Sequence, residues 1–334
     1  MDPDTEAIEH WARLGAANTV GIVGLGGAGC EAVHDLVTQG LPNVPSIAIN
    51  TDAAALRSLE IPDRILLGQR QMRGRGSGGD RSVVLAAAEE SSEELVRRLR
   101  RFEIVFLLAG LGGGTGSALL PFLVRELRDT STLAVPVAFL PFHIELESNP
   151  DRRHNTAEAL DELERMGGLL LALANEKLRK FEALPLRQVL HVRNAYLHSL
   201  VSGLVDMVEH PSQLNVDLAS LKWHLKDSGT STLLLSEEHV SEPERLVHQA
   251  LSETLLDFEL SDAPSALVHV EGGSNLSLRT VDRVWKAMRR RLGEPKRMLV
   301  GTRTRPEPRE VVRLTAVVGG LRPTTLRDAL AAAL

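Results

Sequence analysis

Two glycine-rich runs have the composition of phosphate-binding loops. Gly24, Gly26 and Gly29 follow a short apolar run in the spacing GxGxxG, and the run GLGGGTGS over residues 110–117 follows another. In each case an apolar-periodic segment typical of a helix comes next. Glycine lets backbone N–H groups approach a phosphate closely at the positive end of a helix. The two runs therefore predict two phosphate-binding loops, each between a strand and a helix.

The first run taken alone also fits a dinucleotide-binding fold. Asp52 stands at the end of the next predicted strand, where a ribose-binding acid stands in NAD enzymes. The second and longer run argues against such an oxidoreductase, because two glycine loops suit a nucleoside triphosphate held from two sides. The hydroxyls of Thr115 and Ser117 are further hydrogen-bonding groups for that ligand. A dinucleotide-dependent oxidoreductase remains the remote alternative.

The loops need a sheet to position them. Predicted strands and helices alternate over roughly the first 170 residues, which favours a mainly parallel sheet with ligand loops at the carboxyl ends of its strands. We predict an α/β protein with a doubly wound nucleotide-binding domain over residues 1–183. A connecting core helix over residues 184–212 and a smaller C-terminal α/β domain over residues 213–334 follow it.

Composition narrows the class of protein. The 334 residues carry a formal net charge of −6, with 43% hydrophobic and 25% charged residues, which is ordinary for a globular protein and unlike a nucleic-acid-coating one. Cys30 is the single cysteine, and we expect it to be a packing residue in a reducing compartment. The eleven histidines show no metal-ligand spacing. Residues 1–18 lack the pattern of a signal peptide, so we expect a cytoplasmic protein.

Seven collinear segments resemble the tubulin/FtsZ superfamily, and FtsZ more closely than tubulin. They are GIVGLGGAGCEAV, INTDAAAL, RGRGSGGDRSVVLAAAEES, VFLLAGLGGGTGS, PVAFLPFHIE, NEKL and QLNVDLASL, spread over roughly residues 18 to 320. The resemblance implies GTP or GDP as ligand and leaves a Mg²⁺ ion beside the phosphates open. It also implies head-to-tail self-assembly into protofilaments, with GTP hydrolysis completed at the junction between two subunits.

The resemblance assigns roles to named positions. The implied nucleotide-binding set comprises Gly26, Gly27 and Asp52 on the phosphate and ribose side, Gly76, Gly78 and Gly79 in the loop that senses the terminal phosphate, Gly112, Gly113, Gly114, Thr115 and Gly116 as the main phosphate cradle, Glu145 and Arg152 at the ribose, and Asn175 and Asn194 at guanine. Asn215 and Asp217 match the catalytic loop that enters the next subunit's site, where carboxylates position and polarise the attacking water.

Departures from the FtsZ pattern affect catalysis and base recognition. Ser220 stands where FtsZ carries a second acid, and a serine hydroxyl is not an anion near neutral pH. A positioned acid–base group is worth about 10²–10⁴ in rate, so we expect slow hydrolysis. Ala195 stands where FtsZ has an aspartate that reads guanine, which leaves that task to the two asparagines. Glu31 replaces an asparagine after the first glycine loop.

These departures leave two hypotheses about assembly. The first is a self-assembling, slow GTPase; the alternative is a non-hydrolysing structural subunit that binds GTP and co-assembles with another FtsZ. The linker and partner-binding peptide usual at the end of FtsZ chains have no counterpart before Leu334. Membrane contact is therefore expected to be only indirect, or weak through the basic stretch from Arg283 to Arg305. No nucleic-acid partner is expected.

Overall fold

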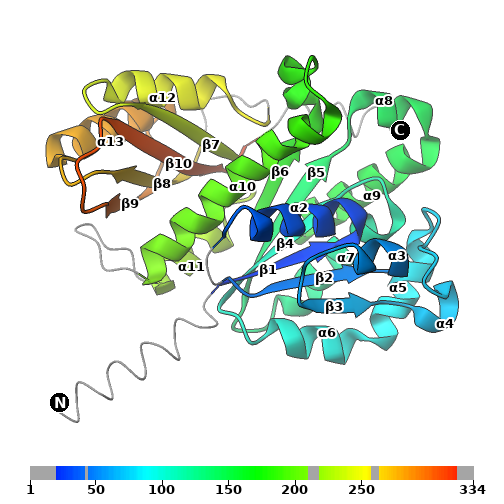
Figure 1. The fold of residues 1–334 in the computed structure, drawn as a ribbon. Helices are drawn as coiled ribbons and strands as arrows, with labels where there is room; N and C mark the ends of the chain where they lie inside the picture. Colours follow the sequence, from blue (N-terminus) through cyan, green and yellow to red (C-terminus); the bar gives the residue numbers. More distant parts are fainter. Residues whose placement is uncertain (1–19, 42–43, 210–217, 257–262, 322–334) are drawn as a thin grey trace, which may run out of the picture. The chain divides into compact units, whose positions relative to one another are not determined.

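The computed structural model describes residues 20–41, 44–209, 218–256 and 263–321, which divide into two compact units, residues 1–136 and 137–334 (Figure 1). β5 (Leu133–Leu140) begins in the first unit and ends in the second. The predicted domain boundaries at residues 183 and 213 stay a prediction.

The first unit contains a parallel sheet. β1 (Val20–Leu25) pairs in parallel with β2 (Ser46–Asn50) on one side and β4 (Ile104–Gly110) on the other, and β2 pairs with β3 (Asp63–Leu66). Every residue of β1 is buried, as expected of a parallel strand covered on both faces. The helices are α2 (Gly26–Thr38), α3 (Ala53–Arg57), α4 (Gln69–Met72), α5 (Arg81–Glu90), α6 (Ser92–Leu99) and α7 (Gly114–Leu127).

The second unit has a mixed sheet. β5 and β6 (Leu170–Ala174) are parallel, and β6 is parallel to β7 (Thr230–His239). β10 (Val311–Gly319) runs antiparallel between β7 and β8 (Ser265–Gly272), and β9 (Arg297–Thr304) closes this edge in parallel with β8. The helices are α8 (His143–Ser148), α9 (Pro150–Met166), the 3₁₀ helix η1 (Asn175–Phe181), α10 (Leu186–Glu209), α11 (Leu218–Lys226), α12 (Pro243–Ser252) and α13 (Leu278–Arg291).

The predicted fold class, α/β with a mainly parallel sheet, is confirmed. The stretch predicted as a connecting core helix, residues 184–212, contains α10. Two details differ from the sequence pattern. Residues 81–101 are rich in Ala, Glu, Leu and Arg, which favours one helix, but they form two, α5 and α6, that meet at Ser91. The pattern also gave no prediction of β9. β9 is an edge strand with Arg297 and Arg303, and charged side chains are common on edge strands because they discourage pairing with another chain.

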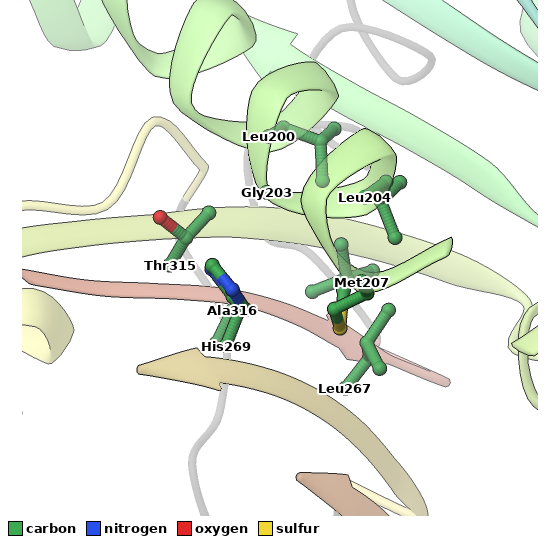
Figure 2. A pocket seen from close by; sticks show the side chains of 9 residues that line it. Leu200, Gly203, Leu204, Met207, Leu267, His269, Thr315 and Ala316 are labelled. Atoms are coloured by element: carbon green, nitrogen blue, oxygen red, sulfur yellow. The ribbon is translucent and has the colours of Figure 1, made fainter. Parts of the chain in front are cut away.

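Side chains alternate between the two faces of the β7–β10 sheet. On one face Val268, Leu314 and their neighbours pack against α12 and α13 in a buried core. On the other face Leu267 and His269 of β8 point toward α10, beside Leu200 and Met207 (Figure 2). The space between them is a cavity of about 10 Å³, room for about one water molecule, so it is a packing void and not a ligand site.

His269 is buried against α10 and its Nε2 atom has no hydrogen-bond partner among the described residues. Burial lowers the pKa of His269 from its ordinary value of 6.5 to about 4; the nearby carboxylates of Asp206 and Glu271 oppose this shift. Gly203 makes the arrangement possible, because a Cβ there would lie 3.0 Å from His269 Nδ1.

The low pKa of His269 makes stability depend on pH. As the pH falls below 6.5, His269 becomes protonated in the unfolded chain, whereas in the folded chain it stays neutral until about pH 4. The free energy of unfolding therefore decreases as the pH falls through this range. Between pH 7 and pH 5 the unfolding free energy of the wild type should fall by about 2 kcal/mol more than that of His269→Gln. Urea denaturation at the two pH values measures both changes. His239→Gln, at an exposed site on β7, is the control and should follow the wild type. Equal losses in His269→Gln and the wild type would contradict the assignment.

Candidate functional site

The first glycine loop lies against the start of α7. β1 ends at Leu25, and α2 begins at Gly26, whose φ of +69° places it in the left-handed region. A Cβ on Gly26 would lie 3.0 Å from the backbone nitrogen of Gly116 and 3.3 Å from Cβ of Thr115. Gly27 is exposed, and a Cβ there would meet nothing within 4 Å. The backbone of the first loop thus packs against the second glycine loop at Gly26 and is exposed at Gly27.

The second loop connects β4 to α7. Gly113 precedes the helix with φ −80°, and a Cβ on it would meet nothing within 4 Å. The backbone N–H of Gly112 donates to Ser117 Oγ at 2.8 Å, and Thr115 Oγ1 lies 2.8 Å from Thr51 Oγ1. Both hydroxyls predicted to face a ligand are buried and hydrogen-bonded inside the protein. They hold the loop in place, and a ligand contact by Thr115 stays a prediction.

A third loop, residues 74–80, packs on the start of α7 and on the residues that follow β2. The N–H of Gly76 donates to the carbonyl of Thr51 at 3.1 Å, and Ala53 N–H donates to Gly74 at 3.0 Å. A Cβ on Gly114 would lie only 2.4 Å from Ser77 Oγ, which shows how closely this loop packs on the start of α7. At Gly78 and Gly79 a Cβ would meet nothing within 4 Å. The structure thus brings the sequence-predicted glycines of all three loops together in the first unit.

The starts of α2 and α7 have the electrostatics of an anion site. α3 and α5 are capped by Asp52 and Asp80, whose carboxylates accept backbone N–H groups, whereas neither α2 nor α7 has a side-chain cap. A helix start carries partial positive charge on its first N–H groups, and an anion satisfies them when no side chain does. Arg73 at the end of α4 and Arg75 in the third loop are exposed and add positive charge to the same unit.

Asp52 has a structural role as well as a predicted ligand role. Its Oδ1 atom accepts N–H groups from Ala54 and Ala55 at 2.8 and 3.0 Å. This bond begins α3 directly after β2, so Asp52 sits at the carboxyl end of its strand as expected. A contact with ribose or phosphate stays a prediction.

The predicted ribose contacts in the second unit are paired with each other. Arg152 Nη1 lies 2.5 Å from Glu145 Oε1, and Glu145 Oε2 accepts the N–H of Phe142 at 3.1 Å. Asn149 caps α9 and places Arg152 in its first turn, one turn from α8. The pair is partly exposed, so both groups are accessible to a ligand.

The two predicted base-reading asparagines share one buried cation. Arg193 on α10 donates from Nη1 to Asn175 Oδ1 at 3.1 Å, and from Nε and Nη2 to Asn194 Oδ1 at 3.3 and 3.2 Å. Its guanidinium carbon lies 3.8 Å from the ring centre of Phe139 on β5. Arg193 is 4% exposed, and the asparagines are 8% and 2% exposed. Sequence reasoning missed Arg193; the available signal was a charged residue directly before Asn194 in the apolar pattern of a long helix.

The remaining predictions concern the catalytic loop, Cys30, metal binding and membrane helices. Asn215 and Asp217 lie outside the described residues, and Ser220 is partly buried in the first turn of α11. Burial raises the pKa of the Cys30 thiol to about 12, which fits a packing residue.

Within the described residues no cluster of three or more His, Cys, Asp or Glu could hold a metal ion. None of the described helices has the length and apolar character needed to cross a bilayer.

The basic stretch from Arg283 to Arg305 spreads over α13 and β9. Several of its cations are in ion pairs: Arg283 with Glu244, Lys286 with Asp282, and Arg303 with Asp206. Pairing of this kind reduces the positive charge that the stretch can offer to an anionic surface.

Comparisons with known proteins agree with this geometry. Residues 19–183 match the Tubulin/FtsZ family, GTPase domain, and residues 234–322 match the FtsZ family, C-terminal domain. The cell division protein FtsZ of Methanothermobacter thermautotrophicus is 31% identical over 303 residues, covering 90% of this chain and 79% of that protein. FtsZ of Haloferax mediterranei is 32% identical over 302 residues, with the same two coverages of 90% and 79%.

A solved structure gives the same result. The FtsZ dimer of M. jannaschii is 30% identical, covers 96% of this chain and 93% of its own, and superposes with a TM-score of 0.82. Both the glycine-loop half and the C-terminal half are thus matched, and the match to a GTPase domain implies a guanine nucleotide as ligand. The chain belongs to the tubulin/FtsZ family of cytoskeletal GTPases.

Proposed function

We propose that this chain is an FtsZ-like subunit that binds GTP, assembles head to tail, and hydrolyses GTP slowly where two subunits meet. The observation that carries the proposal is the meeting of three glycine loops at the uncapped starts of α2 and α7. Backbone N–H groups at two helix starts suit the di- or triphosphate of GDP or GTP. Mg²⁺ commonly binds through substrate phosphates and water, so it needs few protein ligands here.

Gly113 offers a sharp test of phosphate binding. Its φ of −80° suits any residue, and a Cβ would meet no protein atom within 4 Å, so Gly113→Val should fold normally. The valine side chain would fill the space beside the start of α7 and keep a phosphate away. We expect GTP affinity to fall at least about 100-fold in equilibrium binding, with an unchanged melting temperature. Undiminished affinity in the folded variant would refute the assignment. Gly114→Val is not informative, because it clashes with Ser77 inside the protein.

Exposed apolar side chains at opposite ends of β6 support head-to-tail assembly. Leu184 and Leu186 are 43% and 63% exposed after η1, which follows the carboxyl end of β6. Trp223 on α11 is 63% exposed, and α11 ends beside the amino end of β6, where a Cβ on Gly168 would lie 3.3 Å from the carbonyl of Lys226. Two different apolar surfaces favour a heterologous contact, which builds a filament when its rotation does not close.

Trp223 tests the assembly surface. Trp223→Ser should raise the concentration needed for assembly with a slowly hydrolysed GTP analogue at least about tenfold, because it removes a large apolar contact. Leu278→Ser is the matched control, since Leu278 is an exposed apolar residue on α13, 75% exposed. Sedimentation and light scattering measure both variants. Equal assembly of Trp223→Ser and the wild type would contradict the proposed junction.

Ser220 tests the slow hydrolysis. If the missing carboxylate limits the rate, Ser220→Asp should raise phosphate release by assembled protein about 10- to 100-fold, within the range expected of a positioned acid–base group. Ser241→Asp, in an exposed turn after β7, controls for added charge and should have no effect. Brisk wild-type turnover that Ser220→Asp leaves unchanged would show that another group supplies the charge. A protein that binds GTP but neither assembles alone nor hydrolyses it would instead favour co-assembly with another FtsZ.

A further inference from the structure

The side chain of Glu176 joins two segments that follow neighbouring strands. β5 and β6 are parallel neighbours, and α8 follows the first while η1 follows the second, so both segments start at the carboxyl edge of the sheet. Glu176 is the second residue of η1. Its Oε2 atom accepts the backbone N–H of His143, the first residue of α8, at 2.9 Å. One side chain therefore links η1 directly to the start of α8.

This bond satisfies a donor that α8 cannot satisfy by itself. The first N–H groups of a helix have no backbone acceptor within the helix. The N–H of Phe142, just before α8, donates to Oε2 of Glu145 in the first turn of the same helix at 3.1 Å. The N–H of His143 donates instead to a residue of η1. Glu176 therefore fixes where α8 starts relative to η1.

The Glu176 carboxylate is itself held in place. Its side chain is 19% exposed, and Oε1 accepts from Nη1 of Arg179, one turn further along η1, at 3.2 Å. Burial raises the pKa of Glu176, but the hydrogen bonds from His143 and Arg179 outweigh burial and keep this pKa below its ordinary value of 4.5. Glu176 is thus ionised near neutral pH, and an ionised acceptor makes the stronger hydrogen bond.

The two linked segments carry predicted contacts to different parts of one nucleotide. Asn175, directly before Glu176, is a predicted base contact, whereas Glu145 and Arg152 are the predicted ribose contacts. Glu145 lies two residues after His143 on α8, and its carboxylate pairs with Arg152. A shift of α8 away from η1 would therefore move the ribose contacts away from the base contact.

We propose that Glu176 is a positioning residue, whose bond to His143 holds the ribose contacts at the correct distance from the base contact. Recognition of the ribose hydroxyls then depends on Glu176, which acts through α8. Displacement of a binding group by about 1 Å is enough to lose most of its effect. The inference rests on the proposed nucleotide site.

The wild-type protein provides the first test. GTP and its 2′,3′-dideoxy form differ only in the ribose hydroxyls. Competition against a fluorescent GTP analogue labelled on the terminal phosphate gives both affinities. We expect GTP to bind at least about tenfold more tightly, because hydrogen bonds to charged groups are the stronger kind. Equal affinities would overturn the inference. Binding of neither nucleotide would instead contradict the proposed function itself.

His143→Pro removes the bond from the donor side. Proline has no N–H, is well tolerated at the first position of a helix, and requires an extended residue before it. Phe142 meets that requirement with φ −64° and ψ 150°. We expect the affinities for GTP and the dideoxy form to come within about threefold of each other. His143→Ala keeps the N–H and is the matched control, which should retain the wild-type ratio.

Variants of Glu176 remove the bond from the acceptor side. Glu176→Met fills a similar volume without an acceptor and should behave as His143→Pro does, whereas Glu176→Gln keeps an oxygen for the His143 N–H and should restore most of the ratio. Glu182→Gln is the control for the ion pair, because Glu182, just after η1, is the other carboxylate that pairs with Arg179. It should retain the wild-type ratio.

The ratio of the two affinities separates positioning from a purely structural role. A purely structural role would lower the melting temperature and leave the ratio unchanged in folded His143→Pro and Glu176→Met. That result would overturn the inference, and so would loss of the ratio in His143→Ala or in Glu176→Gln.

Discussion

Close backbone packing at glycine holds the nucleotide-loop region of the first unit together. A Cβ on Gly29 would lie 2.0 Å from the carbonyl oxygen of Leu108, and one on Gly116 would lie 2.4 Å from that of Gly110. Contacts this short allow no side chain, so α2 and α7 can start close to β4 only because these positions are glycine. The third loop packs on the same helix start at Gly114. The distances between the loops thus depend on absent side chains.

The candidate binding groups in the two units are of different kinds. In the first unit the candidate phosphate-binding groups are backbone N–H groups, which every residue except proline carries. The choice of residue in these loops is therefore restricted chiefly by the space available for a side chain. In the second unit the predicted base contacts, Asn175 and Asn194, are side chains whose Oδ1 atoms accept hydrogen bonds from a neighbour, Arg193.

The two main departures from the FtsZ pattern share one physical consequence. Ser220 and Ala195 both stand where the FtsZ pattern has a carboxylate, the first in the predicted catalytic loop and the second at the predicted base-binding position. A carboxylate at these positions would orient water or accept hydrogen bonds from guanine, and neither serine nor alanine carries that charge.

The sequence by itself determined the fold class, the glycine loops and the family, because apolar periodicity and glycine spacing are local properties of the chain. The roles of Asn215 and Asp217 stay predictions on that same basis. Only the tertiary structure decided that Thr51 bonds to Thr115, 64 residues away, and that Arg193 holds Asn175, 18 residues away. It also decided that the hydroxyls of Thr115 and Ser117 are used inside the protein. Such contacts depend on how distant segments pack, and a pattern of neighbouring residues contains no information about that packing.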